Sequence, residues 1–170
     1  MLDKLVPVKF GILFSLLTLL YGFALGGAFG AFEGAIKGHL KGSAEEVFET
    51  VYKSDSKKME KISKKSWVYF KRAHLHANGL GVIALILSVF VALFFESKLK
   101  ALAATLVGIG SLGYSSFWMF AGLMAPGMGS TGAAKESLKW LAVPSAAFCT
   151  IGLAIVIVLV INSLFLKKGE

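Results

Sequence analysis

The stretch FGILFSLLTLLYGFALGGAFGAF, from Phe10 to Phe32, contains no charged residue and lies between Lys9 and Glu33. A helix that rises about 1.5 Å per residue needs ~20 apolar residues to cross the hydrocarbon core of a membrane. We therefore predict a transmembrane helix here. A secretory signal is the weaker interpretation, because its apolar core would be shorter.

Three further stretches share this property, and the predicted spans are about 10–32, 73–95, 101–124 and 140–166. The composition agrees, since 56% of residues are hydrophobic and only 16% are charged. Spans in lipid must satisfy every backbone polar group internally, which favours helices. The predicted fold class is all-α: an integral membrane four-helix bundle, forming a single domain over residues 1–170. We expect a multi-pass protein of a bacterial or archaeal inner membrane.

The segment between the first two spans is predicted to be helical and amphipathic over 43–72. Ser43 and Glu46 have the spacing of a capping box, which indicates a helix start. Asp55 is placed to cap a second helix that runs through Trp67 into the second span. We expect two short helices that lie on the membrane surface or against the bundle.

The net charge of +8 does not point to nucleic acid, because no DNA- or RNA-binding signature accompanies it. Basic residues of a membrane protein set its topology and attract anionic lipid, so membrane lipid is the expected partner. The 33–72 segment and the 125–139 loop share one side and hold twelve of the 18 Lys and Arg residues. This excess predicts that the 33–72 segment is cytoplasmic.

Cys149 is the single cysteine of the chain. A single cysteine excludes an internal disulfide, a covalent CxxCH haem site and any metal cluster held by several cysteines. A small buried side chain is the expected role of Cys149.

Glycines recur at every fourth position from the first span onward, in a glycine-zipper pattern. The series is Gly22, Gly26, Gly30, Gly34, Gly38 and Gly42. This spacing keeps small residues on one slowly rotating helix face, where another backbone or a flat ligand can approach closely. Helix packing or homo-oligomerisation is the expected use, with Gly22, Gly26, Gly30 and Gly34 as the contact face. A groove for a planar cofactor is the alternative.

All three histidines map to the side of the 33–72 segment: His39 follows the first span, and His74 and His76 open the second. Histidines at a membrane boundary are candidates for function, and neutral imidazole is a common ligand of haem iron and copper. Two residues along a helix correspond to a rotation of about 200°, so His74 and His76 should point to opposite faces. Each can then serve a different haem, or one can ligate while the other donates a hydrogen bond.

Neighbouring residues suit a porphyrin at this position. Gly79 leaves room for it, and Lys71 and Arg72 can neutralise its propionates.

The motif HLHANGLG, from His74 to Gly81, resembles the His-x-His-x-x-x-Leu-Gly helix of haem–copper oxidases and nitric oxide reductases. The resemblance implies that His74 and His76 ligate haems on opposite faces of one helix. It covers eight of 170 residues. Those catalytic subunits have about a dozen spans and further histidines that this chain lacks. Oxygen or nitric oxide reduction is therefore not expected, and only haem ligation carries over.

The leading hypothesis is a cytochrome b-like subunit that binds haem b and takes part in electron transport within a larger redox complex, with quinone as a candidate partner. His74 and His76 are the predicted ligands, with His39, Met124 or Met128 as candidates for further ligation. A non-catalytic scaffold that docks through the glycine series is one alternative. A copper-handling protein that uses the three histidines and the methionines is another. No catalytic residues are predicted.

Overall fold

The computed structural model describes residues 2–166, and every regular element in that range is helical. The elements in chain order are α1 (Leu2–Leu5), η1 (Val6–Val8), α2 (Lys9–Glu45), α3 (Ser56–Phe94), α4 (Leu99–Met124), α5 (Thr131–Ser137), α6 (Lys139–Ile161) and η2 (Asn162–Leu166). The all-helical prediction is confirmed for the described residues.

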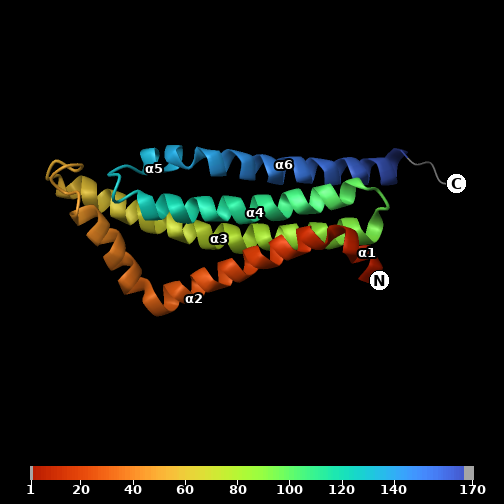
Figure 1. Ribbon diagram of the computed structural model, residues 1–170, viewed down its shortest axis with the longest axis horizontal. Coiled ribbons are helices and arrows are strands. Elements are labelled where there is room, and N and C mark those ends of the chain that lie inside the picture. Colours follow the sequence, from red (N-terminus) through yellow and green to blue (C-terminus); the bar gives the residue numbers. More distant parts are fainter. Residues whose placement is uncertain (1, 167–170) are drawn as a thin grey trace.

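Four helical stretches are long and apolar enough to cross a membrane. They are Leu2–Glu45, Ser56–Phe94, Leu99–Met124 and Lys139–Leu166. Each corresponds to one of the four predicted spans, and the second helix ends at Phe94, one residue before the predicted end. The long helices run side by side along the longest axis of the molecule, with α1 and the end of α6 at the same end (Figure 1).

The long helices pack unevenly around α4, which contacts α2, α3 and α6. Helix α2 also contacts α3, whereas α6 packs mainly on α4. Apolar side chains of α6 consequently face outward: Trp140 is 70% exposed, and Ile151 and Ile157 are each 50% exposed. Such a surface needs an apolar environment, either lipid or another protein.

Small residues bring the backbones of neighbouring helices close together. A Cβ atom on Gly108 of α4 would lie 2.9 Å from the carbonyl oxygen of Gly11 on α2. On the opposite side of α4, a Cβ on Gly110 would lie 2.7 Å from Cys149 Sγ of α6. Cys149 thus packs at a helix contact. Close backbone approach of this kind is typical of helix pairs in lipid, where no hydrophobic driving force acts between helices.

Helix α2 bends at Phe32, the elbow of the red-to-orange helix in Figure 1, where φ is −131° and ψ is 22°. Gly30 and Gly34 flank the bend, and a Cβ on either would meet no atom within 4 Å. Glycine pairs are a common cause of helix kinks. We call residues 33–45 the outer leg of α2. It leaves the line of the first span and returns toward the start of α3 (Figure 1).

The predicted capping box at Ser43 and Glu46 is wrong, because α2 continues through Ser43 to Glu45. Ion pairs one turn apart stabilise the outer leg, with Lys37 bound to Glu33 and Lys41 bound to Glu45. The expected pair of short helices is replaced by the outer leg of α2 and the first half of α3.

The second predicted start is correct. Asp55 caps α3 by accepting a hydrogen bond from the Lys58 amide at 2.9 Å. Helix α3 then runs 39 residues without a break, through Trp67 into the apolar stretch. The turn before it is tied to the α4–α5 loop, since the buried Tyr52 hydroxyl donates to the Pro126 carbonyl at 2.6 Å.

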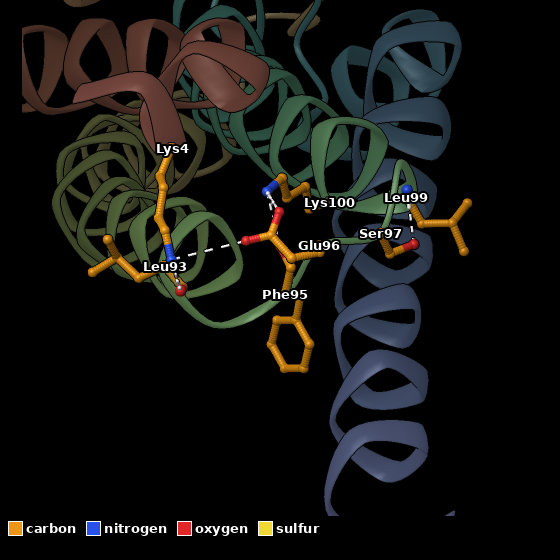
Figure 2. A network of polar contacts seen from close by, with 7 residues as sticks. All are labelled: Lys4, Leu93, Phe95, Glu96, Ser97, Leu99 and Lys100. Carbon is orange, nitrogen blue, oxygen red and sulfur yellow. Dashed lines mark hydrogen bonds and ion pairs between the residues drawn. The ribbon is translucent and has the colours of Figure 1, made fainter. Parts of the chain in front are cut away.

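At the opposite end, two lysines cap the end of α3 (Figure 2). Lys100 is 6% exposed, and its ammonium donates to the Phe95 carbonyl at 2.8 Å. Glu96 lies between Lys100 and Lys4, at 3.5 Å and 3.8 Å from their ammonium groups. Lys4 also reaches the Leu93 carbonyl at 3.5 Å. The network satisfies carbonyls that the helix end leaves free and joins α1 to the α3–α4 turn.

We predict that Lys100→Met lowers the free energy of unfolding by about 1–3 kcal/mol, because the buried Phe95 carbonyl loses its donor while the apolar stem is kept. Denaturant unfolding in detergent measures the change. Lys98→Met is the matched control, since Lys98 is exposed in the same turn and should change stability by less than about 0.5 kcal/mol. Equal unfolding midpoints for the two variants would contradict the assigned role.

Candidate functional site

The two histidines of the HLHANGLG motif lie on opposite sides of α3 and are both half-buried. Ala73, which precedes His74, and Ala77, which follows His76, are fully buried. His74 contacts α2, whereas His76 contacts aromatic residues of α4. This arrangement follows from the rotation of about 200° between them.

His74 occupies a notch in α2 that glycine creates. Its Nδ1 lies 2.8 Å from the carbonyl oxygen of Gly22. A Cβ on Gly26 would lie 2.8 Å from His74 Cε1, so a larger residue there would displace the imidazole. The Phe29 ring stands edge-on to the imidazole, at 5.8 Å between centroids. The first part of the glycine series therefore serves a contact within the chain.

Asn78, which sequence reasoning did not select, completes the His74 environment. Its Nδ2 lies 3.2 Å from the His74 carbonyl oxygen and 3.5 Å from His74 Nε2. A Cβ on Gly22 would lie 2.6 Å from Asn78 Oδ1, which is buried without a hydrogen-bond partner. The sequence did contain a signal for Asn78, since a spacing of four residues from His74 places both side chains on one face of a helix.

His76 is held against α4. Its Nδ1 lies 2.8 Å from the Arg72 carbonyl oxygen, one turn back along α3. The ring packs at 5.3 Å from Tyr114 and at 6.0 Å from Trp118, nearly parallel to the latter. The Arg72 guanidinium in turn covers Trp118 at 4.8 Å from the ring centroid.

The hydrogen bonds define the same tautomer for both imidazoles. A carbonyl oxygen can only accept, so Nδ1 of His74 and Nδ1 of His76 must each carry a proton. Neutral rings in this tautomer present the Nε2 lone pair, which is the state that ligates a metal. A backbone carbonyl that fixes the ring in this way is a typical support for a ligating histidine.

The basic residues and the open glycine of the motif divide between the two sides. Arg72 and Gly79 are within about 60° of His76 around the helix, whereas Lys71 is within about 60° of His74. Gly79 is exposed, and a Cβ there would meet no atom within 4 Å. The His76 side therefore combines an imidazole, a cation and free space.

The other candidate ligands lie away from this pair. His39 is exposed on the outer leg of α2, beyond the bend. Met124 ends α4 six residues after Trp118, which corresponds to ~9 Å along the axis, and Met128 lies in the following turn. Within residues 2–166, no three His, Cys, Asp or Glu side chains group as a metal site would require. The fold does not gather the three histidines at one point.

No protein-family model matches this chain, and no curated protein or solved structure matches it either. The resemblance of the HLHANGLG motif thus stands on its eight residues alone.

The glycine contacts give a direct test of the His74 notch. We predict that Gly26→Ala lowers the free energy of unfolding by about 1–3 kcal/mol, because the new methyl group overlaps the imidazole. Gly30→Ala is the matched control one turn along, and it should be neutral or stabilising by up to about 1 kcal/mol. Detergent unfolding curves of the two variants make the comparison. A Gly26→Ala protein as stable as the control would show that His74 does not sit in this notch.

Proposed function

We propose that this protein is an integral membrane subunit that binds haem b and passes electrons within a larger redox complex. The observation that carries the proposal is the shared state of His74 and His76. Each places Nδ1 at 2.8 Å from a backbone carbonyl that can accept its proton. In the neutral ring this leaves the Nε2 lone pair of His76 for a ligand, whereas the Asn78 amide lies 3.5 Å from Nε2 of His74. Haem b, when bound, supplies a one-electron redox centre.

The His76 side offers the better fit for a porphyrin. Arg72 precedes His76 by one turn and is exposed, so its guanidinium can pair with a propionate at the edge of the apolar stretch. Gly79 follows on the same side and leaves the helix surface bare. Tyr114 and Trp118 can border the macrocycle with aromatic faces. We assign His76 as the first ligand.

The His74 side is more enclosed, since α2 approaches within contact distance at Gly22 and Gly26. Lys71 is the cation on this side. Asn78 already contacts His74, with its amide nitrogen 3.5 Å from Nε2. His74 could ligate a second haem only if the Asn78 side chain turned away. We therefore consider His76 the better candidate ligand of the two. A further ligand beside His76 would come from a partner subunit.

The membrane topology follows from the same distribution of charge. The 33–72 segment carries ten of the 18 Lys and Arg residues, which favours the cytoplasmic side for it. The histidines would then lie near the cytoplasmic boundary of the membrane.

Spectra of histidine variants test the haem assignment. In protein expressed with sufficient haem and purified in mild detergent, we expect a b-type reduced-minus-oxidised spectrum. His76→Ala should remove most of the Soret absorbance, and His74→Ala,His76→Ala should remove all of it, because no imidazole is left on α3. His39→Ala is the control and should retain the spectrum. A double variant that keeps its absorbance would refute ligation by this motif, and so would a colourless wild-type protein.

A second candidate function is a scaffold that docks other membrane subunits. Beyond Gly26, the glycines of the series are open: a Cβ on Gly30, Gly34, Gly38 or Gly42 would meet no atom within 4 Å. Among residues 2–166, the apolar outer side of α6 is also exposed. Both surfaces can receive helices of a partner or of a second copy.

For this candidate, Gly30→Leu with Gly34→Leu should abolish association measured by cross-linking in native membranes, because the added side chains hold a partner helix away. Thr50→Leu, on the exposed turn after α2, is a control that adds bulk outside the series. Association that survives the double substitution would rule out docking through these glycines.

A further inference from the structure

A cavity of about 540 Å³ opens between the outer leg of α2 and the first half of α3. The bend at Phe32 creates it, because the outer leg turns back toward the start of α3 instead of continuing along the first span (Figure 1). The lining residues are Lys37, Leu40, Lys41, Met59, Glu60, Ser63, Lys64, Trp67, Val68 and Lys71. None of the three histidines lines it, and Lys71 is the one residue that it shares with the His74 side of the candidate haem site.

Four of the side chains that line the cavity are lysines, against a single lining glutamate. Lys37 and Lys41 are paired with Glu33 and Glu45, which lie outside the lining. Glu60 is already bound by Lys64 at 2.5 Å, and the hydrogen bond and charge of Lys64 lower the pKa of Glu60 below its usual value. Lys71 has no acidic partner among residues 2–166. The cavity is therefore suited to a ligand that carries negative charge.

The interior of the cavity is apolar. Leu40 is 2% exposed and forms part of its wall, together with Met59 and Val68. The indole of Trp67 is covered by the Lys37 ammonium at 5.1 Å, so one wall presents an aromatic surface and a cation together. The Ser63 hydroxyl is buried beside the cavity with no hydrogen-bond partner. A ligand here needs an apolar part and polar groups as well as charge.

The position on α3 indicates where such a ligand comes from. Lys71 lies two residues before Ala73, where the uncharged stretch begins. From the cavity, an exposed apolar row continues along α3 at spacing seven: Val68, Leu75 and Val82, which are 38%, 66% and 46% exposed. Residues seven apart share one helix face. The cavity thus opens onto an apolar path that leads into the membrane.

We propose that this cavity binds one anionic phospholipid. Its phosphate lies among Lys41, Lys64 and Lys71, and its glycerol region contacts Trp67. Its acyl chains leave along the row of Val68, Leu75 and Val82. Anionic lipid is attracted to basic side chains at the membrane surface. Because the apolar walls continue along the apolar row of α3, a ligand with acyl chains fits this cavity better than a water-soluble anion does. An uncharged quinone has no anionic group with which the lysines could form an ion pair.

Tryptophan quenching tests this site, because Trp67 lines the cavity and the chain has only three tryptophans. A Trp118→Phe,Trp140→Phe protein retains Trp67 as its sole tryptophan. It is placed in bilayers that contain brominated phosphatidylglycerol or brominated phosphatidylcholine. We expect Trp67 to favour the anionic lipid about fivefold or more. Sole Trp140, 70% exposed on α6, should show little preference and reports the bulk lipid.

Lysine variants decide whether the preference arises in the cavity. Lys41→Gln with Lys71→Gln should lower the preference at Trp67 by at least about fivefold, since each lysine near the surface contributes roughly that factor. The matched control is Lys57→Gln with Lys65→Gln, which removes two exposed lysines of α3 outside the cavity and should leave it unchanged.

Inorganic phosphate, added at constant ionic strength, should not relieve quenching if the ligand is a lipid. Equal quenching of Trp67 by the two lipids would overturn the proposal. An equal loss of the lipid preference in both lysine double variants would also overturn it, and so would complete relief of quenching by phosphate. Quenching of the sole-Trp67 protein with all its lysines does not depend on the lysine variants, so the proposal is decided even if a lysine pair misfolds. The preference compares two lipids with one protein preparation, so its haem content is equal in both arms and this test stays separate from that of the proposed function.

Discussion

The uninterrupted helix α3 is the constraint on which the other features depend. It joins a basic half to an apolar half within 39 residues, and its rotation of about 100° per residue determines which side chains share a side. Trp67, Lys71 and His74 are thereby directed to the side of α2. Arg72, His76 and Gly79 are directed to the other side, where Tyr114 and Trp118 of α4 lie. A helix break between Trp67 and Gly79 would disrupt both the candidate haem site and the cavity.

The bend of α2 works together with this helix. Before Phe32, α2 lies close enough to α3 for Gly22 and Gly26 to contact the His74 ring and Asn78. After Phe32 the outer leg departs, and its lysines face those of α3 across a cavity. Close packing and an open space therefore occur on the same pair of helices. The difference lies in what faces each glycine. Asn78 lies against Gly22 and His74 against Gly26, whereas no atom of residues 2–166 outside the helix itself lies within 4 Å of a Cβ placed on the later glycines of the series.

Polar groups in the apolar region are few, and most of them are bonded to backbone. Both imidazoles use a carbonyl oxygen, which fixes their tautomer without a carboxylate. The buried Ser15, Thr18 and Ser111 hydroxyls return to carbonyls four residues back at 2.7 Å. Because these hydroxyls bond to the backbone of their own helix, they need no partner on the neighbouring helix. The small side chains then allow the close contacts of α4 with α2 and α6.

The sequence by itself determined the helices, because the length of each uncharged stretch and the need to satisfy backbone groups in lipid leave no other regular structure. It also determined that His74 and His76 point to opposite faces, and that Asp55 starts a helix, since both follow from local geometry. The end of α2 was predicted wrongly at Ser43. A capping-box pattern is local, whereas the ion pairs and packing of the outer leg stabilise the helix past it.

Only the tertiary structure decided which glycines are filled, that Asn78 accompanies His74, and that four lysines from two helices surround one cavity. These depend on how two helices approach each other, which periodicity within one helix does not encode.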